Sequence, residues 1–291
     1  MRLGNRLKRY VLLCGLLTIT VVVCNMPYPA LGNSNPKNWV VYYHNELPPS
    51  AFEDYDIVVF DSEHHPSIQS VQAAGATVYG YISLGEVEQY RSHFEAVKKD
   101  GILLRENVNW PGSYYVDMRS RAWTERVIYE LVPEILRSGF DGIFIDTLDN
   151  PIELEQEDPV KYRGMADAAA MLVRTIAAEF PETKIIVNRG YEILPQIAAS
   201  ITGVLGESVY TTYDFEEKRA KPTTKDDYTY QVDMLKSLKK INPDLIVMTL
   251  DYWDISDTQR VRELYAKQRS NGFLPYVATV DLHKLIPEPA P

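Results

Sequence analysis

Short apolar runs alternate with amphipathic stretches along the chain from Asn38 onward. An apolar run of this length, bounded by turn residues, is typical of a buried strand, and apolar residues at a spacing of three or four are typical of a helix. The predicted strands are Trp39–Tyr43, Ile57–Phe60, Val78–Leu84, Tyr114–Val116, Ile143–Ile145, Lys184–Val187, Gly203–Leu205, Leu245–Leu250 and Leu274–Val277. The clearest predicted helices are Ala122–Leu136, Asp167–Glu179, Tyr228–Lys240 and Thr258–Gln268.

This alternation predicts an α/β protein with a parallel sheet wrapped by helices, and the length fits one (β/α)8 barrel of the TIM type. A barrel needs eight strands, so one of the predicted strands is an extra or a wrong prediction. The weakest two are Tyr114–Val116 and Leu274–Val277. A doubly wound open sheet is the alternative, but no glycine-rich phosphate loop follows any predicted strand.

The first 32 residues form a segment of their own. Basic residues between positions 2 and 9 precede an apolar run that ends at Cys24, and a small-residue site follows at Ala30-Leu31-Gly32. This is the pattern of a secretory signal peptide. An uncleaved membrane anchor is one alternative, and lipidation of Cys24 is a weaker one, because Val23 stands where a small residue is needed. We therefore expect an exported protein, periplasmic or extracellular, with one catalytic or binding domain over residues 33–291.

Composition narrows the possible partners of that domain. Both cysteines lie in the first segment, so the domain has no disulfide, cysteine-based zinc site or thiol nucleophile. The whole chain has a net charge of −10, and residues 1–32 hold four basic and no acidic residues, so the remainder is near −14. Such a surface repels nucleic acid and polyuronates, but a neutral or cationic partner remains possible.

Polar and acidic residues stand at the end of almost every predicted strand. In a parallel barrel these ends meet at one face, which is the catalytic face. The strand-end residues are Asp61, Glu63, Glu86, Glu88, Asp117, Asp146, Asn188, Glu207, Asp251 and Asp254. Neighbouring carboxylates raise one another's pKa, so one can act as a general acid while another acts as a nucleophile or base. Two such carboxylates flank the scissile bond in glycoside hydrolysis.

The predicted strand at Ile143–Ile145 is the centre of this arrangement. Asp146 takes its last position, and Asp149 and Asn150 follow in what we expect to be a loop, because Pro151 opposes an immediate helix. The alternative for Asp149 is that it caps the next helix.

Aromatic residues near the same strand ends could stack on sugar faces. The candidates are Tyr42, Tyr81, Trp110, Tyr115, Tyr210, Tyr252 and Trp253.

Four stretches of the chain resemble glycoside hydrolase family 114. They are Tyr79–Glu86, Gly139–Asp149 with its Gly-Phe-Asp-Gly start, Val187–Gly190, and Glu207 at a strand end. The family comprises endo-α-1,4-polygalactosaminidases and includes the hydrolase domain of bacterial proteins that make the Pel biofilm polysaccharide. The resemblance extends from about Trp39 to Leu285 and implies a barrel hydrolase that cuts α-1,4-linked galactosamine polymers without a metal or other cofactor.

The resemblance also implies the catalytic pair, Asp146 and Glu207. We take Asp146 as the nucleophile and Glu207 as the acid/base. A separation of about 5 Å between the two carboxyls predicts retention of anomeric configuration, and about 6.5 to 9.5 Å predicts inversion. An acidic cleft would attract the ammonium groups of a partly deacetylated polymer. The expected substrate-binding residues are Asp61, Glu86, Asp117, Asp149, Asn188, Tyr210, Asp251 and Tyr252.

Other functions stay open at this point. A non-catalytic polysaccharide-binding barrel would keep an acidic, aromatic cleft without needing the paired carboxylates, and the barrel could also cut a different glycan. The segment Asp61–Pro66 combines carboxylates and imidazoles, but residues on one extended loop rarely all face one ion, so no metal site is expected there. A serine hydrolase is set aside because the Gly-x-Ser-x-Gly elbow is missing.

Overall fold

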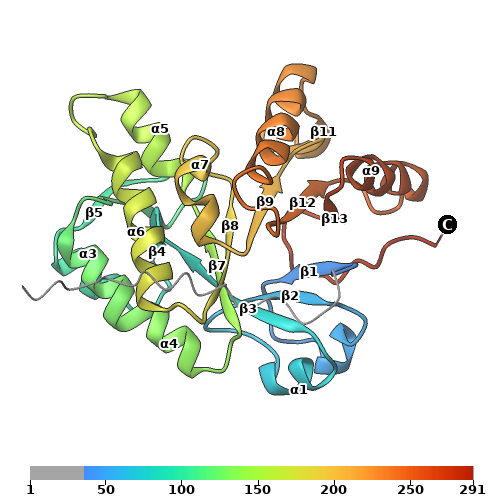
Figure 1. Cartoon of the computed structure of the whole chain (residues 1–291), viewed down its shortest axis with the longest axis horizontal. Helices are drawn as coiled ribbons and strands as arrows, with labels where there is room; N and C mark the ends of the chain where they lie inside the picture. Colours follow the sequence, from blue (N-terminus) through green and yellow to red (C-terminus); the bar gives the residue numbers. More distant parts are fainter. Residues whose placement is uncertain (1–35, 291) are drawn as a thin grey trace, which may run out of the picture.

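Eight parallel strands form one sheet in the computed structural model, which describes residues 36–290 (Figure 1). The predicted signal segment, residues 1–32, lies outside the described residues. Neighbouring strands follow the order β1-β2-β3-β7-β8-β9-β12-β13. Their bounds are β1 Trp39–Tyr42, β2 Ile57–Asp61, β3 Thr77–Ser83, β7 Gly142–Asp146, β8 Lys184–Asn188, β9 Gly203–Glu207, β12 Ile246–Tyr252 and β13 Leu274–Ala278. The nearly closed barrel confirms the predicted fold class and excludes the doubly wound open sheet.

Helices cover the outside of this sheet (Figure 1). They are α1 Ile68–Ala73, α2 Phe94–Lys99, α3 Arg121–Arg126, α4 Val132–Arg137, α5 Asp149–Glu157, α6 Met165–Glu179, α7 Leu194–Ile197, α8 Lys225–Leu238 and α9 Thr258–Ser270, with short 3-10 turns at Pro49–Phe52 and Ala198–Ser200. The predicted helix Ala122–Leu136 corresponds to α3 and α4 joined by a π-helical turn, Val127–Leu131. Within residues 36–290 the structure contains no helix with the length and apolarity that a membrane crossing requires.

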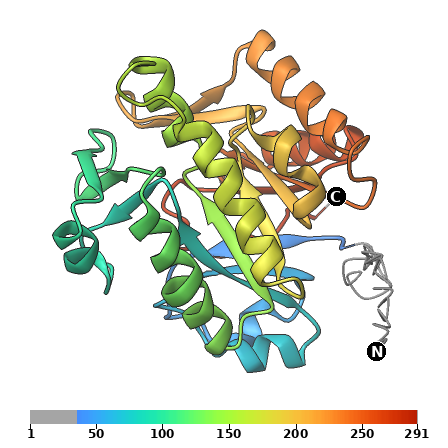
Figure 2. The same cartoon turned by 60° about the vertical axis from the view of Figure 1, so that its left-hand side comes forward.

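The helices begin and pack as their sequences dictate. The Thr224 side chain caps α8 by accepting the Asp227 N–H, and Asp257 caps α9 by accepting the Arg260 N–H. Helix α6 buries its apolar face, including Leu172 and Ile176, against the barrel. Figure 2 shows α4 and α6 lying across the outside of the sheet.

The strands β1 and β13 are not joined by a ladder of backbone hydrogen bonds. Side-chain contacts and the segment that follows β13 close the barrel there. The Trp39 indole N–H donates to the carbonyl of Leu274 at 3.0 Å, and the Trp39 and Tyr276 rings lie 5.5 Å apart. Beyond β13, the Tyr43 N–H donates to the Leu282 carbonyl at 3.0 Å. The predicted strand Leu274–Val277 is therefore a true barrel strand.

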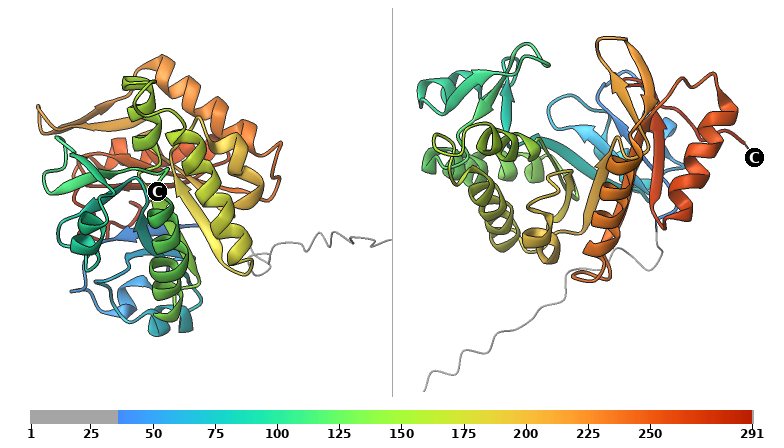
Figure 3. Two further views of the ribbon diagram at one scale, coloured as in Figure 1. Left: turned by 90° about the vertical axis from the view of Figure 1, so that its left-hand side faces the viewer. Right: turned by 90° about the horizontal axis from the view of Figure 1, so that it is seen from above.

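Two antiparallel insertions extend on the same side of the barrel (Figure 3). One is a three-stranded sheet of β4 Glu86–Glu88, β5 Leu103–Glu106 and β6 Ser113–Val116, and the other is a hairpin of β10 Thr211–Asp214 and β11 Arg219–Pro222. The prediction of Tyr114–Val116 as a barrel strand was wrong. The segment is a strand, but it belongs to this small sheet and not to the barrel. Its short run resembles a barrel strand in sequence, but its middle residues are only half buried.

Candidate active site

Three neighbouring barrel strands end in the side chains that form the centre of the site. Asp146 ends β7, Asn188 ends β8 and Glu207 ends β9. The Asn188 side-chain Nδ2 donates to Asp146 Oδ1 at 2.9 Å and to Glu207 Oε2 at 2.6 Å. One amide group therefore bridges two carboxyls and fixes their separation.

Further donors hold the two carboxyls. Asp146 Oδ1 also accepts the Thr147 N–H at 2.8 Å, and Asp146 Oδ2 accepts the Tyr81 hydroxyl at 3.0 Å. Glu207 Oε1 accepts the Tyr252 hydroxyl at 2.7 Å. Because each carboxyl oxygen has a donor, both side chains are locked in orientation before any substrate binds.

Burial and a neighbouring charge perturb the titration of Asp146. Burial, and then the negative charge of Glu207, raise the pKa of Asp146 to about 7. Burial also raises the pKa values of the Tyr81 and Tyr252 hydroxyls well above their ordinary value, so both stay protonated and donate at neutral pH. Asp146 therefore titrates near neutral pH instead of in the ordinary range of a carboxyl.

The residue after each of these strand ends has a left-handed backbone, although none is glycine. The φ angles are 65° at Thr147, 52° at Arg189 and 58° at Ser208. Such a conformation costs on the order of 1 kcal/mol or more and persists only where neighbours hold it. Here they do, because the Arg189 N–H donates to Leu205 O at 2.9 Å and the Ser208 N–H to Leu250 O at 2.8 Å. Three adjacent strands thus end in the same strained turn around one site.

The carboxyl pair lies in a cleft of about 940 Å³ at the carboxyl ends of the strands. Residues from both insertions and from the segment after β13 also line this cleft. Its acidic residues are Asp61, Glu86, Glu88, Asp146, Asp149, Glu207 and Asp281, and the arginines among its lining residues are Arg91 and Arg189. The cleft therefore presents a negative field to a ligand.

Five of the predicted substrate-binding residues line the cleft, which are Asp61, Glu86, Asp149, Asn188 and Tyr252. Asp61 is already paired, because its Oδ2 lies 2.8 Å from Arg91 Nη1 and its Oδ1 accepts two backbone N–H groups. Glu86 is buried and accepts the Asn107 side chain at 2.9 Å, and burial raises its pKa. Both residues therefore support the walls of the cleft.

Asp149 lies in the first turn of α5 rather than in a loop. The prediction that Pro151 delays the helix was wrong, since proline is tolerated in the first helical turn, where its missing N–H is not needed. Asp149 does not cap the helix either. It accepts the Gly190 N–H at 2.8 Å and pairs with Arg189 at 2.6 Å, so it fixes the turn after β8.

The other three predicted substrate-binding residues, Asp117, Tyr210 and Asp251, are not among those that line the cleft. Asp117 forms a two-pronged ion pair with Arg119 beyond β6. Tyr210 packs on Tyr228 at 5.1 Å on the α8 side of the barrel.

Asp251 is 1% exposed and faces α9, where its Oδ2 accepts the Gln268 side chain at 2.7 Å. Its Oδ1 accepts the N–H groups of Tyr210 and Thr211. Alternation along β12 explains this position. Leu250 pairs in register with Glu207 and faces the cleft, so Asp251 faces outward and Tyr252 inward again.

Among the aromatic candidates, Tyr81, Trp110 and Tyr252 line the cleft. Tyr42 is buried in the core, Tyr115 lies beneath the Arg105 guanidinium, and Trp253 packs beside α9.

Several cleft residues were not predicted. Arg91 lies between Glu88 and Asp61 and over the Tyr81 ring. Tyr43 lines the cleft, where burial and then the charges of Asp146 and Glu207 raise its pKa. Tyr213 and Phe215 come from the unpredicted β10–β11 hairpin. Arg91 lies in a loop beyond the third predicted strand and has no sequence signal of its own. Tyr43 stands at the end of the first predicted strand and could have been found there.

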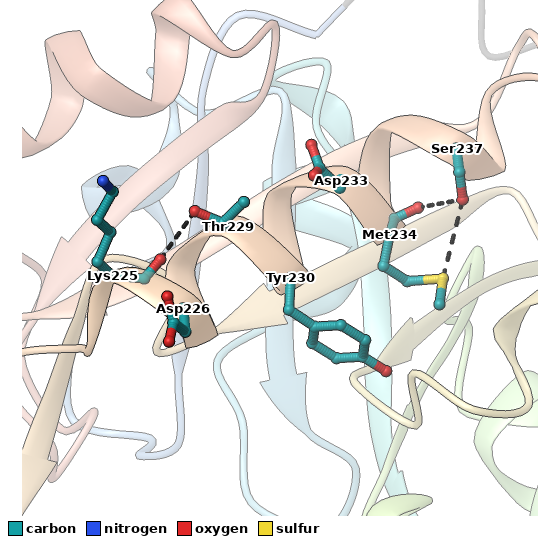
Figure 4. Close-up of a pocket in the computed structure, with 7 residues that line it drawn as sticks. All are labelled: Lys225, Asp226, Thr229, Tyr230, Asp233, Met234 and Ser237. Atoms are coloured by element: carbon teal, nitrogen blue, oxygen red, sulfur yellow. Dashed lines mark hydrogen bonds between the residues drawn. The ribbon is translucent and has the colours of Figure 1, made fainter.

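A second hollow along α8 has none of these features. It is lined by Lys225, Asp226, Thr229, Tyr230, Asp233, Met234 and Ser237, all on one helix (Figure 4). The Thr229 and Ser237 hydroxyls donate to carbonyls of their own helix, so they are already satisfied. Among residues 36–290, the cleft included, no group of three or more His, Cys, Asp or Glu side chains is arranged to hold a metal ion.

We expect Gly85→Ala to disrupt the site by displacing Thr147, the residue that follows Asp146. A Cβ on residue 85 would overlap the carbonyl oxygen of Thr147, and the Gly85 N–H now donates to the Thr147 hydroxyl at 2.8 Å. The turn that carries Asp146 would have to shift, which should cost about 1–3 kcal/mol of stability and most of the activity. Thermal unfolding and activity assays measure both effects. Gly101→Ala is the control for backbone strain. Its φ of 69° makes alanine unfavourable there, but the new Cβ meets no atom within 4 Å, so this variant should lose some stability and keep its activity. An equal loss of activity in Gly101→Ala would contradict the argument.

Comparisons with known proteins agree with this geometry. The model of glycoside-hydrolase family GH114 matches residues 28–289. An uncharacterized protein of Thermotoga maritima is 27% identical over 273 residues, which cover 84% of this chain and 81% of the relative.

Two solved structures share the fold. The glycoside hydrolase domain of PelA from Pseudomonas aeruginosa superposes with a TM-score of 0.76 at 23% identity, covering 87% of this chain and 99% of that one. Ega3 of Aspergillus fumigatus, in complex with galactosamine, superposes with a TM-score of 0.64 at 17% identity, covering 87% of this chain and 94% of that one.

Proposed function

Since the chain belongs to glycoside hydrolase family GH114, we propose that it cleaves internal bonds of an α-1,4-linked galactosamine-containing polysaccharide. The observation that carries the proposal is the pair of carboxyls, Asp146 and Glu207, bridged by Asn188 at the floor of an acidic cleft. The galactosamine bound to Ega3, a structural neighbour, supports an amino sugar as the substrate unit.

The charge of the cleft supports the same substrate class. A partly deacetylated galactosamine chain carries ammonium groups, and the acidic residues of the cleft outnumber its two arginines. Opposite charge raises the local concentration of such a chain and orients it. The cleft would correspondingly repel a polyuronate.

We assign the nucleophilic role to Asp146 and the acid/base role to Glu207. Asp146 attacks the anomeric carbon while Glu207 gives its proton to the leaving glycosidic oxygen, so the C–O bond breaks and a glycosyl ester of Asp146 forms. Glu207 then takes a proton from water, and the water oxygen displaces Asp146 from the anomeric carbon. Over the two steps Glu207 loses one proton and regains one, so the enzyme returns to its starting state, and the steps require no cofactor.

The hydrogen bonds support this division of roles. Asp146 accepts three donors, of which the Thr147 peptide N–H cannot rotate away, and these donors favour the charged form that a nucleophile needs. Glu207 accepts two donors, and the Tyr252 hydroxyl among them can rotate to accept a hydrogen bond from a protonated carboxyl, as a general acid requires.

We expect the reaction to retain anomeric configuration. Asp146 Oδ1 and Glu207 Oε2 both bond to one nitrogen, so they are at most about 5.5 Å apart, which matches a retaining pair and leaves too little room for the water of an inverting one. NMR of the first products, recorded before mutarotation, should show the α-anomer. A β-anomer as the first product would contradict the assignment of a nucleophile.

The pH dependence should reflect the ionisation of Asp146, because the nucleophile must be charged to attack. Burial and the negative charge of Glu207 raise the pKa of Asp146 to about 7. With a substrate that has no ionisable group, kcat/KM should therefore fall about tenfold per pH unit below about pH 7. In Glu207→Gln the acidic limb of the residual activity should move to lower pH, because the negative charge that raises the pKa of Asp146 is gone. A limb that stays in place in that variant would mean that another group titrates.

The substrate is tested by varying acetylation and salt. Reducing-end release should be fastest from a partly deacetylated α-1,4-galactosamine polymer, and added salt should slow it, because salt screens the attraction between ammonium groups and the cleft. Cleavage of a fully acetylated polymer should respond little to salt. Binding of the polymer without cleavage would favour a non-catalytic binding barrel, and cleavage of other glycans alone would favour a hydrolase for a different sugar.

We further propose that the protein is exported, as residues 1–32 predict, so that it meets an extracellular polysaccharide such as that of a biofilm. Fractionation of the producing cells tests this, and accumulation of full-length protein in the cytoplasm would contradict it.

A further inference from the structure

Two exposed aromatic side chains from different insertions meet at the rim of the cleft. Trp110 lies in the turn between β5 and β6, and Phe215 lies at the tip of the β10–β11 hairpin. Their ring centroids are 5.3 Å apart and nearly perpendicular, and both line the cleft. The two insertions approach each other in the views of Figures 2 and 3.

The exposure of this pair is unusual for its residue types. Trp110 is 50% exposed and Phe215 is 52% exposed, whereas Trp39 and Trp123 are almost fully buried. Large apolar side chains left in water beside a binding cleft commonly mark a place where a ligand covers them. A purely structural contact between the insertions would bury more of each ring.

Local hydrogen bonds hold the turns that carry both rings. The Trp110 backbone N–H donates to Asn107 O at 3.2 Å, and the Asn107 side chain donates to Glu86. On the hairpin, Asp214 Oδ1 accepts the N–H groups of Glu216 and Glu217, which fixes the turn that carries Phe215. Tyr213 supports the Phe215 ring at 5.2 Å. The surface is therefore preformed, and little ordering cost remains when a ligand binds.

We propose that Trp110 and Phe215 form an aromatic platform that binds a pyranose ring of the polymer away from the bond being cleaved. The inference rests on the proposed function, since it places a second part of the same substrate. A pyranose presents a face of C–H groups to which an aromatic ring is complementary, while its hydroxyl and amino groups remain free for the acidic residues of the cleft. The platform would thus favour long chains over short ones, which suits an enzyme that cuts internal bonds.

The test compares a long polymer with a short oligosaccharide that does not reach the rim. In the variant with both Trp110→Ala and Phe215→Ala, kcat/KM for the polymer should fall about tenfold, mainly through KM, while kcat/KM for the short substrate changes less than about twofold. The conservative variant with Trp110→Phe and Phe215→Tyr should keep most of the activity on the polymer. Tyr129→Ala is the matched control, because Tyr129 is 72% exposed but is not among the residues that line the cleft.

A binding measurement separates this inference from the proposed function. In the Asp146→Asn background, added polymer should change the tryptophan fluorescence, and Trp110→Phe should abolish that change. If the wild type cleaves the polymer and the double alanine variant cleaves it equally well, the platform is wrong while the function stands. If both substrates lose activity equally, the pair only joins the insertions. If the wild type neither binds nor cleaves the polymer, the proposed function and the platform fall together.

Discussion

Asp146→Asn should lower kcat for polysaccharide cleavage by about a thousandfold or more, and Glu207→Gln should have an effect of similar size. Each substitution keeps the shape of the side chain but removes the group to which we assign formation of the glycosyl ester or transfer of the proton. The Asn188 bridge makes the two losses interdependent, because the same Nδ2 positions both carboxyls. Reducing-end assays on purified variants measure the loss, and thermal unfolding checks that each variant folds.

The roles of the two residues are distinguished by the leaving group. A substrate with an acidic phenol as leaving group needs little proton donation, so Glu207→Gln should recover much of its first-step rate on it, whereas Asp146→Asn should not. Asp117→Asn is the matched control, since it removes a carboxylate that lies outside the cleft lining and pairs with Arg119. Its activity should stay within about twofold of the wild type. Recovery by Asp146→Asn instead would reverse the assignment.

Asp251→Ala should lower the free energy of unfolding by about 3 kcal/mol or more. The change leaves three buried donors without an acceptor, which are the Gln268 amide and the peptide N–H groups of Tyr210 and Thr211. Each unsatisfied buried donor costs about 1–3 kcal/mol. For a domain of this size the melting temperature should drop by roughly 6–12 °C. Calorimetry or circular dichroism measures the shift.

The same variant tests whether Asp251 contacts substrate. Because its carboxyl faces α9, the folded protein should keep its KM for the polymer within about threefold. Asp251→Asn is the milder comparison, since its side-chain oxygen can still accept the two peptide N–H groups. A large rise in KM for Asp251→Asn with an unchanged melting temperature would restore the original prediction that this residue holds substrate.

The strand pattern and the strand-end carboxylates were visible in the sequence because both follow from burial. Apolar runs identified all eight barrel strands, and the strand ends led to Asp146, Asn188 and Glu207. The search for polar residues at strand ends also selected Asp251, whose side chain faces outward because the inward-facing residues of β12 are its neighbours Leu250 and Tyr252. Strand boundaries are uncertain by a residue or two, so the inward parity at a strand end could not be assigned.

Other features had no sequence signal. The hairpin of Thr211–Asp214 and Arg219–Pro222 is polar and solvated, so it looks like a loop. The left-handed turns at Thr147, Arg189 and Ser208 lack the glycine that usually marks this conformation, because tertiary hydrogen bonds impose it. The contact between Trp110 and Phe215 joins insertions distant in sequence, which no local pattern encodes.

The way the barrel is closed determines the order in which this protein can fold. The Trp39 indole can form its hydrogen bond only after Leu274, 235 positions further along the chain, has been synthesised. A ribosome delivers β1 first, so the seam edge of that strand stays open until nearly the whole domain has been synthesised. An unpaired strand edge can pair with other chains. The risk of aggregation therefore rises with the lifetime of the partly folded protein in which β1 lacks this contact. Production of the protein should therefore benefit from low temperature or a chaperone that binds extended segments.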